Sequence, residues 1–295
     1  MVKCLSSPRM TVAFTLAAVL AVFPYSAVAQ TPVPDPVVPP PPPREIELNL
    51  INLPTTMSME RHHGYFRLTH RFARDLRRGS VGQLAEDLFS LDNGAIIGFE
   101  YRFALTGNMH VGVHRSILSK TIQALTRYEP FRQGEGMPVS VSVLGSIEGL
   151  NNLRQQYQPG VAVTFSRAFG AGHVLYVTPA FVGRTRVADF LSGHDDDHGI
   201  GEAEDEHSDH RHTAFVGLGA RVRLLPTAYL VGEYSPRIAG HDPGNGVWGV
   251  GVEKKTGGHT LQMNVTNSFG TTLGQVARGG SEHDIYLGFN VTRKF

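Results

Sequence analysis

Hydrophobic and polar residues alternate along most of the chain from residue 64 onward, in runs of about ten residues. In the run at residues 96–103, one face carries Ile97, Phe99 and Tyr101, and the intervening positions from Gly98 onward are small or charged. Side chains of a β-strand point alternately to its two faces, so each run predicts a strand with one apolar face. No long segment with helical periodicity interrupts these runs. The pattern therefore predicts an all-β fold.

The connections between the predicted strands differ in length. Tight turns at residues 106–108, 170–172, 225–227 and 256–258 alternate with connections that are mostly longer, among them the loop at 184–212. Short turns at one end of a sheet and long loops at the other are typical of outer-membrane β-barrels. The predicted strands are residues 64–73, 95–105, 109–116, 120–131, 139–148, 159–169, 173–183, 213–225, 227–236, 246–255, 259–267 and 283–295.

Alternating strands fit two architectures. A soluble β-sandwich buries its apolar faces, whereas a membrane barrel turns them towards lipid and lines its interior with polar residues. The loop asymmetry and the even strand number favour an up-and-down antiparallel transmembrane β-barrel of about twelve strands, with a secreted sandwich as the alternative.

The last strand also favours a membrane barrel. Leu287, Phe289 and Val291 lie in phase with the C-terminal Phe295. A final strand that ends in an aromatic residue is similar to the recognition strand of bacterial outer-membrane proteins. We therefore expect the outer-membrane assembly machinery and the lipid bilayer as partners.

The N-terminus has the features of a secretory signal peptide. Lys3 and Arg9 precede an apolar stretch at residues 10–23, which is short for a membrane-spanning helix. The small-residue pattern that ends at Ala29 predicts cleavage after this residue, and a retained N-terminal anchor is the alternative. We expect a signal peptide over residues 1–29 and a location in the outer membrane of a Gram-negative-type bacterium.

A proline-rich segment at residues 31–43 follows the predicted cleavage site. Proline lacks an amide donor and has a fixed φ, so this segment predicts an extended polyproline II spacer. We expect residues 30–63 to form a periplasmic tether and pre-strand segment, ahead of a barrel at residues 64–295. A docking segment for a periplasmic partner is the alternative to a plain spacer.

Composition argues against several classes of function. Lys and Arg number 27 against 26 Asp and Glu, a formal net charge of +1. The chain therefore lacks the excess of basic residues that binding nucleic acid by bulk charge requires, and no nucleic acid is expected as a partner. Its one cysteine, Cys4, lies in the predicted signal peptide, which excludes a disulfide framework and a cysteine-rich zinc site.

Several short segments of the chain match a known pattern. On these segments the chain resembles an uncharacterised family of bacterial outer-membrane β-barrel proteins, classed as a domain of unknown function. The resemblance covers residues 50–295 and implies an outer-membrane location, but no activity. The matching segments are NLPTT at 52–56, LTHRF at 68–72, LFSLD at 88–92, MPVS at 137–140, GGH at 257–259, TNS at 266–268, GFNV at 288–291 and the final Phe295.

Charged residues recur on the polar faces of the predicted strands. Charges inside a barrel must pair or contact water, because an unpaired buried ion costs several kcal/mol. Two hypotheses follow: a salt-bridged plug that holds the barrel rigid, or a polar permeation path whose charges tune selectivity. The predicted lumen-lining residues are Arg67, Arg71, Glu100, Arg102, Arg221, Arg223, Glu233 and Glu253.

The long loop contains an acidic, histidine-rich run at residues 194–212. Imidazole and carboxylate groups suit zinc, nickel or copper. No predicted strand fixes the run, so a solvated acidic loop is one interpretation and weak divalent-metal binding is the other. No other cofactor is expected. The candidate metal ligands are His194, His198, His207, His210 and His212.

The sequence gives little support for catalysis. No G-x-S-x-G or HExxH motif occurs, and His70, on the predicted apolar face of the first strand, has no serine that the sequence places beside it. We therefore do not expect an enzyme. The segment at residues 82–92 predicts a short amphipathic helix that either constricts or caps the barrel mouth.

The favoured function at this stage is passive passage or binding of a small solute, of unknown identity, through a narrow polar lumen. The alternative is a structural or interaction barrel with a plugged lumen. Such a barrel would present its loops on one side, or anchor a periplasmic partner on the other.

Overall fold

The computed structural model describes residues 45–86, 94–134, 136–185, 211–240 and 245–295. The predicted signal peptide, the proline-rich segment at 31–43 and most of the loop at 184–212 lie outside these ranges. No described helix is long and apolar enough to cross a membrane.

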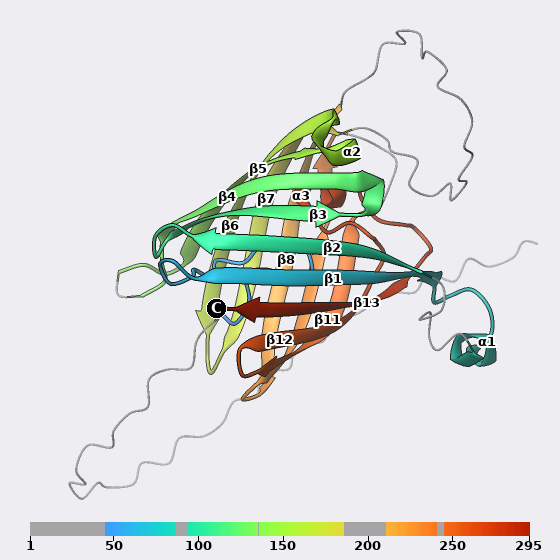
Figure 1. Cartoon of the computed structure of the whole chain (residues 1–295). Coiled ribbons are helices and arrows are strands. Elements are labelled where there is room, and N and C mark those ends of the chain that lie inside the picture. The colour runs from blue at the N-terminus through green and yellow to red at the C-terminus, as the bar shows by residue number, and fades with distance from the viewer. Residues whose placement is uncertain (1–44, 87–93, 135, 186–210, 241–244) are drawn as a thin grey trace, which may run out of the picture. The chain divides into compact units, whose positions relative to one another are not determined.

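The described strands form one antiparallel sheet that closes on itself as a barrel (Figure 1). Each strand pairs with its neighbours along the chain, and the pairing of β8 with β9 and of β1 with β13 leaves no open edge in the wall. A short strand, β10 (Arg237–Ala239), pairs with β8 next to β9 and is not counted as a separate strand of the wall. The wall consists of β1 (Gly64–Asp75), β2 (Ala95–Ala104), β3 (Met109–Ser116), β4 (Thr121–Phe131), β5 (Ser140–Gly149), β6 (Gln155–Phe169), β7 (His173–Thr185), β8 (Arg211–Leu225), β9 (Ala228–Ser235), β11 (Val247–Thr256), β12 (His259–Thr266) and β13 (Tyr286–Lys294).

This architecture confirms the predicted twelve-stranded antiparallel barrel. Closure matters physically because every main-chain N–H and C=O in a bilayer must be paired within the protein. The two faces of the wall follow the predicted alternation: Val113 and Met263 point outwards and are 52% and 53% exposed, whereas Arg67 points inwards and is 2% exposed. The apolar side chains therefore lie where lipid would contact them.

The helices are short and lie between strands. Helix α1 (Val81–Glu86) begins the predicted 82–92 helix, whose later residues fall outside the described ranges, and Figure 1 shows it beyond the end of β1. A 3-10 turn, η2 (Leu118–Lys120), joins β3 to β4, and α2 (Leu150–Leu153) joins β5 to β6. Helix α3 (Leu273–Ala277) belongs to the connection between β12 and β13.

A hairpin formed by residues 45–59 occupies the barrel interior. Leu50 N donates to Leu53 O (2.8 Å), and Thr55 N donates to Leu48 O (3.0 Å). Most apolar side chains of the hairpin are almost completely buried, with Leu48 at 0% and Leu53 at 1% exposed. Residues 45–59, which were predicted as part of a periplasmic segment at 30–63, therefore lie inside the wall. The inner wall carries apolar side chains as well as polar ones, and the apolar ones pack against the hairpin.

The connection between β12 and β13 also folds inwards. All residues of α3 are buried, and the carboxylate of Glu148 on β5 accepts a hydrogen bond from Gly274 N (3.1 Å). Burial lowers the pKa of the Arg278 guanidinium in this connection, and the charge of Glu148 opposes that shift. We call residues 268–278 the inserted loop. It enters from the end of the barrel that carries the longer connections, opposite the end from which the hairpin enters.

The outward face predicts a depth-dependent effect of charge. Met263→Arg, in the middle of β12, should lower the free energy of unfolding by about 2–4 kcal/mol, because arginine at the bilayer midplane lacks water. His259→Arg, at the end of the same strand and face, should cost only about 0–1 kcal/mol. Reversible denaturant unfolding of the refolded barrel in phospholipid vesicles measures both values. Equal costs would contradict a lipid-facing position for Met263.

Candidate functional site

One carboxylate holds the tip of the hairpin. Glu233 on β9 accepts hydrogen bonds from the main-chain nitrogens of Ile51 (3.0 Å), Asn52 (2.9 Å) and Leu53 (3.0 Å). These N–H groups face away from the hydrogen bonds within the hairpin, and buried donors without partners are costly. A charged acceptor shared by successive N–H groups therefore fixes the position of the tip.

The carbonyl groups of the hairpin are matched by donors from the wall. These donors come from strands all around the barrel, so the hairpin is bound on every side. Most are long or charged side chains that reach inwards from β1, β4, β8, β12 and β13. The contacts are Lys294 Nζ to Ile46 O, Arg221 Nη2 to Asn49 O (3.1 Å), Gln262 Nε2 to Leu50 O (3.1 Å), Arg67 Nη2 to Ile51 O, Thr164 Oγ1 to Pro54 O (3.4 Å), Ser142 Oγ to Thr55 O (3.3 Å) and Arg127 Nη1 to Met57 O (2.6 Å).

Glycines on the inner face make room for the aliphatic side chains of the hairpin. A Cβ placed on any of these glycines would lie within 3.0 Å of the side chain above it, closer than such atoms approach. Wall and hairpin are therefore complementary in shape. The pairs, with the distance from the added Cβ to the nearest side-chain atom, are Gly219 with Leu50 (2.2 Å), Gly249 with Ile51 (2.9 Å) and Gly217 with Leu53 (2.6 Å).

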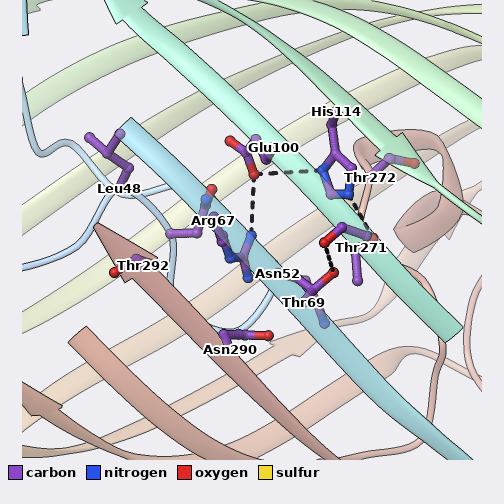
Figure 2. A network of polar contacts seen from close by, with 12 residues as sticks. Leu48, Asn52, Arg67, Thr69, Glu100, His114, Thr271, Thr272, Asn290 and Thr292 are labelled. Atoms are coloured by element: carbon purple, nitrogen blue, oxygen red, sulfur yellow. Dashed lines mark hydrogen bonds and ion pairs between the residues drawn. The ribbon is translucent and has the colours of Figure 1, made fainter. Parts of the chain in front are cut away.

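A buried ion network links the hairpin to the inserted loop (Figure 2). Glu100 is its centre: Oε2 lies 3.5 Å from Arg67 Nη1 and 3.6 Å from His114 Nδ1, and Oε1 pairs with Arg102. Arg67 also donates to the hairpin, and His114 Nε2 lies 3.2 Å from the hydroxyl of Thr271 in the inserted loop. The network therefore reaches both elements that fill the interior.

A second ion pair lies on the opposite side of the wall. Arg221 Nε is 2.8 Å from Glu253 Oε2, and both side chains are fully buried. Gln262 Nε2 donates to the same carboxylate (2.8 Å), and Arg221 also donates to Tyr176 Oη (3.1 Å). Removing one member of such a pair leaves an uncompensated buried charge, which costs several kcal/mol.

A small cavity remains where the hairpin and the inserted loop meet. Its volume is about 30 Å³, and its polar lining includes Asn49, Asn52, Glu100, His114 and Thr271. A space of this size holds about one or two water molecules.

The structure places nearly all of the predicted lumen-lining residues in the interior. Arg223 is the exception: it donates to Ala171 O (2.9 Å) and Pro226 O (3.3 Å) in the turns at the barrel end. Arg127 and Glu148 are buried charged residues of the interior that were not among the predicted ones. Both lie on inward-facing positions of β4 and β5, so the same alternation could have found them. The residues that are buried inside are Arg67, Arg71, Glu100, Arg102, Arg221, Glu233 and Glu253.

The predicted metal ligands are mostly outside the described ranges, which exclude His194, His198, His207 and His210. His212 is described and exposed: its Nδ1 accepts from Arg184 N (3.4 Å), and its ring stacks on a phenylalanine of β7. Among the described residues no group of three or more His, Cys, Asp or Glu side chains is arranged to bind a metal.

His70 packs between two aromatic rings on the outer face. Its ring centroid lies 4.5 Å from that of Phe72 and 4.7 Å from that of Phe289. Its Nδ1 has no hydrogen-bond partner among the described residues. The described contacts therefore place no nucleophile beside this histidine.

Comparison with solved structures finds several outer-membrane proteins, at low identity. Omp33 of Acinetobacter baumannii is 8% identical, with a TM-score of 0.40, over 81% of this chain and 100% of that chain. Outer membrane phospholipase A of Escherichia coli is 12% identical, with a TM-score of 0.38, over 81% and 91%. A bacterial polysaccharide outer membrane secretin is 10% identical, with a TM-score of 0.34, over 80% and 99%. No curated protein matches the chain.

The chain matches one protein family over most of its length. Residues 47–295 match the family described as "Membrane bound beta barrel domain (DUF5777)". The match begins within the hairpin and extends to the last residue, so it includes the wall and the inserted loop. The chain therefore belongs to this family of membrane-bound β-barrel domains.

Proposed function

We propose that the protein is an outer-membrane barrel sealed by its own hairpin, with a structural or interaction role outside the lumen. The observation that carries this proposal is the filled interior: the hairpin and the inserted loop enter from opposite ends and meet around a cavity of about 30 Å³. A sealed barrel acts through what it presents on its two surfaces.

The chemistry of the inner wall supports a seal over an open pore. Leu144, Tyr176 and Phe215 point inwards and pack in one cluster with Leu50 and Leu53 of the hairpin. A water-filled lumen would expose this apolar surface, at a cost of about 1.5–3 kcal/mol for each large side chain. The hairpin therefore serves as part of a hydrophobic core.

The direction of entry supports a role at the periplasmic side. Lys294 and Thr292, near the end of the last strand, contact Ile46 and Glu47 of the hairpin. This end carries the short turns, which face the periplasm in outer-membrane barrels. The described chain thus begins at this end, and the proposed partner is one that binds the proline-rich sequence at 31–43.

Passage of a small solute is a second candidate function, favoured by the charged inner wall. It requires the hairpin to leave the lumen and the wall charges to be solvated. Conductance measurements distinguish the two functions directly.

The wild-type barrel should show no steady conductance in planar bilayers when it is folded and heat-modifiable. The triple variant Leu50→Ala, Ile51→Ala, Leu53→Ala should show intermittent conductance, because each truncation weakens hairpin packing by about 2–5 kcal/mol. Arg223→Gln is the matched control, since among the described contacts Arg223 donates to the turns and not to the hairpin. Steady, ion-selective steps from the wild type would contradict the sealed state, and a silent triple variant would show that the hairpin is not the seal.

The interaction role predicts a partner that depends on the proline-rich segment. Replacing residues 31–43 by a Gly/Ser sequence of equal length should leave heat modifiability and conductance unchanged, because the described contacts of the hairpin begin at residue 45. A photo-crosslinking amino acid at residue 38 should form a defined adduct in cells. The same crosslinker at residue 38 of the Gly/Ser variant should not form it. If no adduct depends on the segment, the proposed periplasmic role is wrong.

A further inference from the structure

We propose that the barrel interior is a peptide-binding site for an extended, aliphatic-rich hairpin, and that residues 45–59 are its resident ligand. The inference deepens the proposed function and rests on it, since a sealed lumen is the occupied form of this site. It assigns the inner wall a ligand class: polypeptide in an extended conformation.

The wall recognises the hairpin mainly through its main chain. Glu233 binds successive N–H groups at the tip, and side chains such as Arg221, Gln262 and Arg127 bind carbonyl oxygens along both arms. Main-chain groups are common to all peptides, whatever their side chains. This mode of recognition supplies affinity that depends little on sequence, as in peptides that bind by strand addition.

The inner glycines supply the selectivity. Gly217, Gly219 and Gly249 leave depressions that receive aliphatic side chains near the tip. A peptide ligand therefore needs large aliphatic residues at the positions of Leu50 and Leu53. It also needs a reversal between them, because Leu50 N donates to Leu53 O.

Other side chains of the hairpin also contact the wall: Leu48 and Met59 pack with Tyr65 of β1, and further contacts are polar. The Oδ1 atom of Asn49 accepts from Arg102 (3.1 Å), and that of Asn52 accepts from Arg71 (3.2 Å). Asn49 precedes the aliphatic tip, and Asn52 lies within it between Ile51 and Leu53. The favoured ligand thus carries amide side chains beside its aliphatic residues.

The site opens at the short-turn end. Both arms of the hairpin leave the interior there, and exposed residues 60–63 connect it to β1. A cut in this connection would separate ligand from site without altering any contact inside the wall. The connection therefore offers a way to test binding in a protein that has already folded.

The experiment begins with a protease site placed at residues 60–63 of the full chain. The refolded protein is cut and then incubated with an excess of a fluorescent synthetic peptide of residues 45–59. The peptide should replace the cut fragment at one per barrel, as measured by fluorescence anisotropy. The same peptide should also be incorporated when the cut protein is unfolded and refolded in its presence.

Matched variants test both parts of the recognition. Arg221→Gln should weaken peptide binding at least about tenfold, because a charged donor to the main chain is lost, whereas Arg223→Gln on the same strand should not change it. A peptide with alanine in place of Leu50, Ile51 and Leu53 should bind the unaltered wall at least about a hundredfold more weakly. A scrambled peptide of the same composition should likewise bind at least about a hundredfold more weakly.

Each outcome is decisive. If the labelled peptide is taken up neither by exchange nor on refolding, the interior is not a peptide site, although a silent barrel in planar bilayers would still support the sealed state. Equal binding of the scrambled peptide would overturn the assigned selectivity. Uptake with the expected dependence on Arg221 and on the aliphatic residues establishes the site.

Discussion

Everything inside this barrel depends on the requirement that buried main-chain groups find partners. The hairpin brings the N–H groups of Ile51, Asn52 and Leu53 to the middle of a space closed to bulk water, and the carboxylate of Glu233 accepts from all of them. Without this acceptor the tip would carry unsatisfied donors, each of which costs about 1–3 kcal/mol. The polar and charged side chains of the wall thus supply the hydrogen-bond partners that the main chain of the hairpin requires.

The ion pairs of the wall serve the same requirement. Arg67 and Arg221 each pair with one carboxylate of the wall and donate to one carbonyl of the hairpin, so one side chain meets both needs. Glu100 connects Arg67 to His114, which reaches the inserted loop. The interior therefore contains two kinds of contact: hydrogen bonds and ion pairs between wall and hairpin, and an apolar cluster packed as in a soluble protein.

The sequence predicted the wall well, because alternation along a strand is a local property. The twelve strands and the inward direction of Arg67 and Glu100 follow from it. Alternation gives the face of a residue but not its depth, so Arg223 has inward phase yet lies at the turns. The hairpin could not be predicted, since its apolar residues have partners only in distant strands: Leu53 packs over Gly217, far away in the chain. The burial of the inserted loop could not be predicted for the same reason, since its contacts are also with distant strands.

The contacts of the hairpin also bear on how the two ends of the chain are joined. The pairing of β1 with β13 brings together strands that are separated by almost the whole barrel sequence, so forming this seam has a large loop-closure entropy cost. The hairpin lies across the inner side of the seam, where it accepts hydrogen bonds from Arg67 of β1 and from Thr292 and Lys294 of β13. The hairpin thus links β1 to β13 from inside the barrel. The first described segment of the chain therefore stabilises the closure that forms when the last strand pairs with the first.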